Sequence, residues 1–127
     1  MDKPSKKKRI LLVDDEPAVL GICGRMLERI GQSAETAGNV EDALALIRKA
    51  SFDLLIEDVM LPDGSGLTVA AEFRKLYPKN PIIVITGSPH ADSREESKKL
   101  GATAYLVKPF EPGLFVETVE KALKSSI

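Results

Sequence analysis

Four short apolar segments of this chain, residues 10–13, 54–56, 82–85 and 104–107, each end at a reactive polar residue. Near-continuous apolar runs of this length are typical of strands that are buried on both faces. If these runs are parallel strands of one open sheet, their carboxyl ends gather along one edge, where doubly wound α/β folds bind ligands. Carboxylates, a hydroxyl and an ammonium would then share one pocket. The polar residues are Asp14 with Asp15, Glu57 with Asp58, Thr86, and Lys108.

The first helix is predicted from an apolar stripe at helical spacing. It begins after Pro17 and stops at Gly31, a good helix terminator. Gly21 and Gly24 inside it each cost about 1 kcal/mol relative to alanine, so we expect close packing at these positions. The residues of the stripe, which we expect to face the core, are Val19, Ile22, Cys23, Met26, Leu27 and Ile30.

Strands and helices alternate strictly along the chain. Together with the near-continuous apolar strands, this alternation predicts a parallel sheet that is covered by helices on both faces. Asn39 is a plausible N-cap of the second helix, and Gly101 closes the fourth. Between the first two helices, residues 33–37 can form only a short, weak strand. The remaining helices are expected at about residues 67–76, 93–100 and 115–123.

Composition limits the classes of function. The 127 residues and 43% hydrophobic content suit one domain with a single core. The formal net charge of -1 gives no general attraction to nucleic acids or anionic membranes, and we interpret residues 1–8 as a solvated basic leader. A lone cysteine and the absence of a signal peptide or an apolar run of ~20 residues favour a cytoplasmic protein. Because no linker or second periodic block follows, we expect no output domain in this chain.

The acids at the strand ends predict a metal site. Asp14, Asp15 and Asp58 would repel one another in a confined pocket unless a cation neutralised them. All three offer hard oxygen ligands, which favour Mg²⁺ over Zn²⁺. A backbone carbonyl just past the third acid, such as that of Met60, would complete the ligand set together with water.

The remaining strand-end residues suit a phosphoryl group. Lys108 supplies a positive charge and Thr86 a hydroxyl donor for anionic oxygens around one phosphorus. In the presence of Mg²⁺, an aspartate carboxylate can act as the nucleophile in phosphoryl transfer and become an acyl phosphate. We expect Asp58 to be that nucleophile.

Four motifs together resemble the receiver domain of bacterial two-component response regulators. They are Leu12-Val13-Asp14-Asp15-Glu16-Pro17, Asp58-Val59-Met60-Leu61-Pro62 followed by Gly64-Ser65-Gly66, Ile85-Thr86-Gly87, and Tyr105-Leu106-Val107-Lys108-Pro109-Phe110. The resemblance covers residues 9–124 and leaves residues 125–127 as a tail. It implies a doubly wound α/β fold whose five-stranded parallel sheet has the flavodoxin-like order 2-1-3-4-5, with five helices on its two faces.

The resemblance also implies a chemical role. Asp58 would accept a phosphoryl group from a phosphohistidine on a sensor histidine kinase or a histidine phosphotransfer protein. Asp14, Asp15 and the Met60 carbonyl would arrange Mg²⁺ beside it. The chain would catalyse its own phosphorylation and slow dephosphorylation, so we do not expect a conventional enzyme.

A conformational switch is implied as well. Thr86 and Lys108 would bind the phosphoryl oxygens, and Tyr105 would turn inward as the threonine moves. The surface of the fourth helix, fifth strand and fifth helix, about residues 92–124, would then change for a downstream protein target. The family often holds the bond between Lys108 and Pro109 in cis. We expect no direct binding of nucleic acid or membrane, and a monomer or a phosphorylation-dependent dimer.

Several alternatives stay open at this point. Glu57 departs from the family pattern and could be the acceptor in place of Asp58. Adjacent strand residues point to opposite faces, however, and the proline four places on selects Asp58. We expect Glu57 to face solvent or pair with a nearby base.

A Mg²⁺-dependent phosphatase with an aspartyl-phosphate intermediate is the main alternative function, although that class typically has a second acid where this chain has Met60. A nucleotide-binding domain lacks its glycine-rich loop here, and a degenerate docking receiver lacks support because the residue set is complete. As an alternative to close packing within the chain, the small residues Gly21 and Gly24 would let a partner protein approach the first helix closely.

Overall fold

The structure is a computed structural model that describes residues 7–87 and 91–125. Most of the expected basic leader and the end of the expected tail therefore lie outside the described residues. Within the described ranges, no helix is long and apolar enough to cross a membrane.

One sheet of five parallel strands forms the centre of the molecule, in the order β2-β1-β3-β6-β7. Counted along the chain without the short hairpin described below, this order is 2-1-3-4-5, which confirms the predicted fold class. The weak strand at residues 33–37 is present and pairs with the first strand along its whole length. The bounds are β1 (Arg9–Val13), β2 (Ser33–Ala37), β3 (Leu54–Asp58), β6 (Ile82–Thr86) and β7 (Ala104–Val107).

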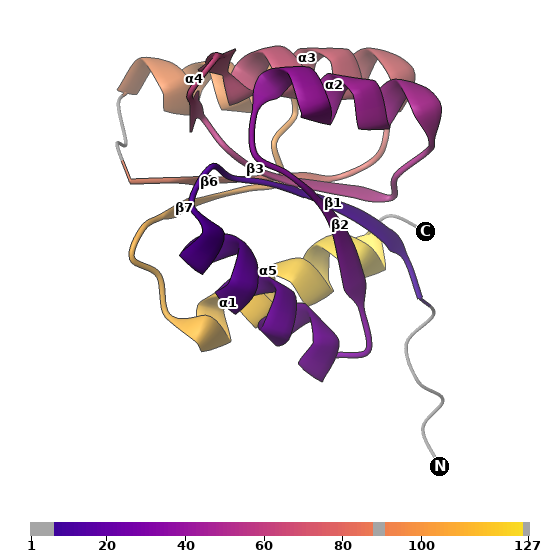
Figure 1. Cartoon of the computed structure of the whole chain (residues 1–127), viewed down its shortest axis with the longest axis vertical. Coiled ribbons are helices and arrows are strands. Elements are labelled where there is room, and N and C mark those ends of the chain that lie inside the picture. Colours follow the sequence, from indigo (N-terminus) through magenta and orange to yellow (C-terminus); the bar gives the residue numbers. More distant parts are fainter. Residues whose placement is uncertain (1–6, 88–90, 126–127) are drawn as a thin grey trace.

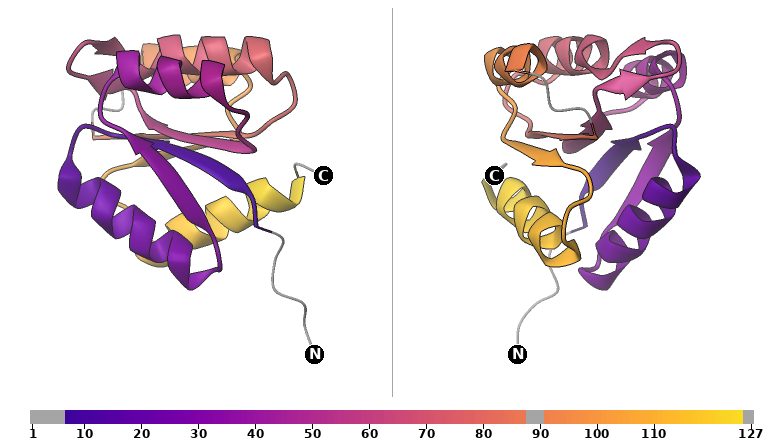
Figure 2. Two further views of the ribbon diagram at one scale, coloured as in Figure 1. Left: turned by 45° about the vertical axis from the view of Figure 1, so that its right-hand side comes forward. Right: turned by 90° about the vertical axis from the view of Figure 1, so that its left-hand side faces the viewer.

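Five helices cover the two faces of the sheet, as Figures 1 and 2 show. On one face lie α1 (Pro17–Arg29) and α5 (Pro112–Ser125); on the other lie α2 (Val40–Lys49), α3 (Gly66–Leu76) and α4 (Ala91–Lys99). Each face has its own hydrophobic cluster, because alternate residues of the buried strands point to opposite sides. Side chains of β3 and β6 are almost completely excluded from solvent, as continuous apolar strands require.

A short antiparallel hairpin, β4 (Met60–Leu61) with β5 (Gly64–Ser65), follows β3. This hairpin was not among the elements predicted from the sequence. Asp63 at the hairpin tip accepts hydrogen bonds from the amides of Val40 and Glu41, at 2.7 and 3.0 Å. These bonds lower the pKa of Asp63 and cap α2 from outside the helix. The hairpin that carries Met60 is therefore fastened to the start of α2.

The expected core face of α1 needs one correction. Cys23, Met26 and Leu27 are buried as predicted, but Ile22 is 47% exposed. Ile22 lies at the margin of the stripe, about a quarter turn from its centre, and Leu20 on the opposite margin packs against the core instead. Ile22 lines an apolar cavity of about 440 Å³ with Phe110.

The expectation of close packing at Gly21 and Gly24 is wrong. A Cβ atom at Gly24 would meet nothing within 4 Å, and one at Gly21 would meet only the Arg25 guanidinium, at 3.8 Å. Both glycines therefore leave unfilled space beside α1. No neighbouring backbone comes close enough to require that these two positions lack a side chain.

We predict that Gly24→Ala raises the free energy of unfolding by about 0.5–1 kcal/mol, because alanine loses less backbone entropy in a helix and its methyl group enters open space. Urea unfolding followed by circular dichroism measures the change. The matched control is Gly31→Ala, which should destabilise the protein since Gly31 has a φ of 77°. An unchanged or lower stability of Gly24→Ala would contradict the prediction.

Candidate functional site

The reactive residues at the strand ends meet at the carboxyl edge of the sheet. Asp14 follows β1, Asp58 ends β3, Thr86 ends β6, and Lys108 follows β7. The backbone amide of Lys108 donates to the carbonyl of Thr86 at 2.7 Å, which joins the last two strand ends. A cavity of about 260 Å³ lies at this edge and is lined by Asp15, Glu16, Asp58, Met60, Thr86, Gly87 and Lys108.

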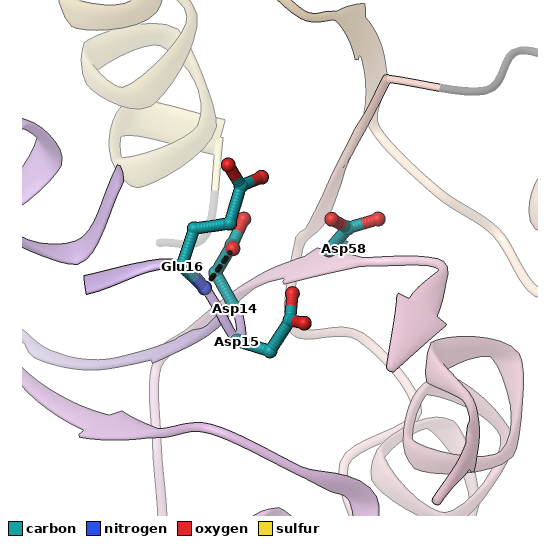
Figure 3. Close-up of side chains that lie close together, drawn as sticks. All are labelled: Asp14, Asp15, Glu16 and Asp58. Atoms are coloured by element: carbon teal, nitrogen blue, oxygen red, sulfur yellow. Dashed lines mark hydrogen bonds between the residues drawn. The ribbon is translucent and has the colours of Figure 1, made fainter. Parts of the chain in front are cut away.

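Four acidic side chains converge beside this cavity. One carboxylate oxygen from each of Asp14, Asp15, Glu16 and Asp58 lies within 4.8 Å of the others. Figure 3 shows three of these side chains rising from the segment after β1, with Asp58 at the end of β3 opposite them. Glu16 was not among the predicted site residues, although it directly follows the acid pair in the sequence.

The Lys108 ammonium lies among these acids. Its Nζ atom is 2.7 Å from Asp14 Oδ2, 2.8 Å from Asp58 Oδ2 and 3.0 Å from Glu16 Oε1. Burial by itself would lower the pKa of Lys108, but its contacts with the three carboxylates hold that pKa above the usual value. The lysine therefore remains charged at any physiological pH. The peptide bond between Lys108 and Pro109 is cis, as the resemblance implied.

Asp14 is buried without full compensation for its charge. Its Oδ1 atom accepts a hydrogen bond of 2.9 Å from the amide of Glu16, but its fully buried Oδ2 accepts no well-aligned hydrogen bond despite the nearby lysine. Burial raises the pKa of Asp14, and the attraction of Lys108 only partly offsets this. One oxygen in the acid cluster thus still lacks an aligned partner.

This donor set fits a hard divalent cation. The cluster consists only of carboxylates, and the incompletely satisfied Oδ2 atom of Asp14 faces the lysine within it. Met60 lines the same cavity, and its amide donates to Asp58 Oδ1 at 3.0 Å, which fixes the direction of that carboxylate. Oxygen ligands of this kind suit Mg²⁺ better than a softer metal.

Glu57 does not face solvent or pair with a base, so that expectation is wrong. Its side chain is fully buried among residues between the sheet and α2 and α3, and neither carboxyl oxygen has a hydrogen-bond partner. Strand alternation does turn it away from Asp58, but both faces of this sheet are covered by helices. Burial, and secondarily the charge of Asp58, raises the pKa of Glu57 well above its ordinary value and so favours the protonated, neutral acid.

Gly66, the first residue of α3, lies directly against the end of β3. Its amide donates to the carbonyl of Val59 at 2.7 Å, and a Cβ atom at this position would overlap the carbonyl oxygen of Asp58. The helix can begin this close to the end of β3 only because residue 66 has no side chain. In the sequence, Gly66 is part of one of the motifs that carry the family resemblance, and that motif gives no indication of this contact.

Tyr105, the expected switch residue, lies on β7 and does not line the acidic cavity. Its hydroxyl is 3.0 Å from Ser93 Oγ, and the Arg94 guanidinium lies 4.6 Å from the centre of its ring. Both partners belong to α4. The tyrosine therefore connects the last strand of the sheet to that helix.

Two other features are less suited to the chemistry. A larger cavity of about 680 Å³ lies between α3 and α4, but it contains none of the strand-end residues. Cys23 is buried in the core, where burial, and secondarily the charge of Asp14, raises the pKa of its thiol to about 11. We therefore place the functional site at the cluster of converging charges. Cys23 contributes to core packing, as predicted.

Comparisons with known proteins agree on one family. The model of the response regulator receiver domain matches residues 10–120. The response regulator protein PilR of Pseudomonas aeruginosa is 34% identical over 118 residues, which are 93% of this chain but only 26% of PilR. The chain thus spans about a quarter of the length of this relative.

Solved structures extend the likeness to the whole fold. The CheY-like receiver domain protein of Methanospirillum hungatei superposes with a TM-score of 0.91 at 33% identity, covering 95% of this chain and 97% of that one. The chemotaxis protein CheY4 of Vibrio cholerae gives 0.84 at 32% identity, covering 93% of this chain and 100% of that one.

Proposed function

Because this chain belongs to the response regulator receiver domain family, we propose that it is the phosphoacceptor module of a two-component signalling system. It takes its phosphoryl group from a phosphohistidine on a sensor histidine kinase or a histidine phosphotransfer protein. The observation that carries the proposal is the contact of one ammonium, Lys108, with the buried acids Asp14 and Asp58 at the carboxyl edge of the sheet. A phosphoryl group needs this combination of a nucleophilic carboxylate and a fixed cation.

Asp58 is the proposed acceptor. Its two oxygens are held by the Met60 amide and the Lys108 ammonium, and the residue is only 5% exposed, so its orientation is restricted. A carboxylate oxygen attacks phosphorus and forms a new P–O bond, while the P–N bond to the donor imidazole breaks and its electron pair stays on nitrogen. The product is an aspartyl phosphate and a free histidine.

Two further side chains bind the phosphoryl oxygens in this proposal. Lys108 offers its ammonium, and Thr86, which ends β6 and lines the same cavity, offers its hydroxyl. Both are fixed by the sheet, since the Lys108 amide is bonded to the Thr86 carbonyl. The two strand ends therefore bring both donors to the cavity in which the phosphoryl oxygens would lie.

Mg²⁺ is the proposed cofactor. Asp14, Asp15, Asp58 and the backbone carbonyl of Met60 would hold it, and the ion would neutralise the acids and the charge on the transferring phosphoryl group. The residues' own contribution is to keep several carboxylates close together in a partly buried position.

The output of the module is a changed protein-binding surface on α4, β7 and α5. Tyr105 connects β7 to α4 through Ser93, while its strand ends at the residue that precedes Lys108. A phosphoryl group that binds one arrangement of Thr86 and Lys108 better than another shifts the population toward that arrangement. The proposed downstream partner of this chain is a protein in the cytoplasm, bound by a monomer or a phosphorylation-dependent dimer.

The test is to incubate the protein with Mg²⁺ and phosphoramidate and to measure its intact mass, beside an Asp58→Asn control. We expect one adduct with the mass of a phosphoryl group, dependent on Mg²⁺ and absent from the control, because the amide is not a nucleophile here. An adduct on the Asp58→Asn protein would refute the assignment of the acceptor. Continuous turnover of unrelated phosphate esters would instead indicate the phosphatase.

A further inference from the structure

The Lys108 ammonium is surrounded by three carboxylates: Nζ donates hydrogen bonds to Asp58 Oδ2 and Glu16 Oε1 and forms an ion pair with Asp14 Oδ2. A lysine ammonium carries three N–H groups, and Nζ lies within 3.0 Å of three carboxylates. The lysine side chain is only 14% exposed, so water has little access to it. A phosphoryl oxygen that is to bind Lys108 must therefore displace one of the three acids.

The three acids differ in how easily they can leave. The side chain of Asp14 is 0% exposed, and without its lysine it would be a buried, unpaired charge. Asp58 is 8% exposed and is itself the proposed acceptor. The Glu16 side chain is 59% exposed and makes the longest of the three contacts, at 3.0 Å. Only this carboxylate can return to water at small cost.

Glu16 gives no side-chain support to the helix that follows it. It is the N-cap residue of α1, but its side chain makes no capping hydrogen bond to the helix. Its backbone serves the site and the helix instead, through its amide to Asp14 and its carbonyl to Leu20. A substitution that changes only the side chain therefore leaves these backbone contacts in place.

We infer that Glu16 is a positioning residue that occupies, on the Lys108 ammonium, the place that an incoming phosphoryl oxygen takes. The inference rests on the proposed phosphoacceptor function. It adds that Glu16 competes with the phosphoryl group for the Lys108 ammonium. Before transfer, Glu16 holds Lys108 over the two buried acids. On arrival of the phosphoryl group, the exposed carboxylate turns out to solvent, and no bond to it is made or broken.

The consequence is that Glu16 weakens binding of the phosphoryl donor. In Glu16→Gln, the competing charge is gone while the shape of the side chain is kept. We expect the phosphoramidate concentration that gives half the maximal phosphorylation rate to fall roughly two- to fivefold, the size of a partly exposed ion pair. The maximal rate should change by less than about a factor of two, since Glu16 does not touch the reacting atoms.

The matched control is Glu111→Gln. Glu111 is an exposed acid three positions after Lys108, so its removal changes the net charge of the protein equally, but it makes no ion pair with the lysine. Both parameters of this control should equal those of the wild type. Equal shifts in the two variants would mean that net charge alone matters and would overturn the inference, as would an unchanged or higher half-saturation concentration in Glu16→Gln.

A second measurement separates failure of this inference from failure of the proposed function. Inorganic phosphate is titrated into the metal-free protein while the side-chain resonances of Lys108 are followed by NMR. We expect Glu16→Gln to bind phosphate roughly two- to fivefold more tightly than the wild type and Glu111→Gln. If no protein is phosphorylated by phosphoramidate, the function fails, and this titration alone then decides whether Glu16 competes with an anion for Lys108; equal affinities would refute that.

Discussion

Replacing Gly66 with alanine is expected to lower the free energy of unfolding by about 3 kcal/mol, a large part of the stability of an ordinary domain. The new methyl group would overlap the carbonyl oxygen of Asp58 and press on Glu57 Oε2, which is 3.0 Å from the added atom. A backbone oxygen at the end of a central strand cannot move aside as a flexible side chain can. The first turn of α3 must therefore shift away from β3.

Urea unfolding measures this loss, and Gly24→Ala provides the control because the same change there meets open space and should stabilise. The shift also moves the backbone of the proposed acceptor, so the rate of phosphorylation of Asp58 should fall in the Gly66→Ala protein that is still folded. A stability within about 0.5 kcal/mol of the wild type would show that α3 can accommodate the methyl group without strain.

Glu57→Met is expected to have the opposite effect and to raise the free energy of unfolding by about 1–3 kcal/mol near neutral pH. Both carboxyl oxygens of Glu57 are buried without a hydrogen-bond partner, and methionine has a similar length but no group that loses hydration. Unfolding is measured with a chelator present, so that no cation contributes. The control is Glu28→Met on the exposed surface of α1, which should change stability little.

The pH dependence provides a second check on Glu57. Its pKa in the folded protein is raised well above the ordinary value, so between these two values the folded state keeps a proton that the unfolded chain has lost. Unfolding then releases a proton, and stability falls as the pH rises through this interval. Glu57→Met should flatten the decline without abolishing it, because the raised pKa of Asp14 acts in the same direction. A decline as steep as that of the wild type would contradict the assignment of the buried proton.

The strands and the edge at which they converge were predictable because burial on both faces leaves a direct trace in the sequence. Runs such as residues 82–85 have no polar member, and the polar residue that follows each run marks its carboxyl end. The same rule explains the error at Glu57, because a charged residue at a buried strand position contradicts the pattern that otherwise identifies such strands. Only the packing of α2 and α3 shows that no solvent-facing side exists there.

Features that depend on distances between segments could not be read from the sequence. The contact of Glu16 with Lys108 joins residues 92 positions apart, and the cap that Asp63 provides for α2 joins residues on different elements. The empty space beside Gly24 is likewise a property of the neighbours, which periodicity along one helix does not reveal. In each case the residue type was compatible with several roles.

The division of the interior into two hydrophobic clusters, one on each side of the sheet, bears on how a protein of this kind can diversify. Substitutions that do not share neighbours combine almost independently in their effect on stability. The layer of α1 and α5 can therefore accumulate changes while the opposite layer of α2, α3 and α4 keeps its packing. Recognition of new partners can in this way evolve on one layer without a compensating change on the other.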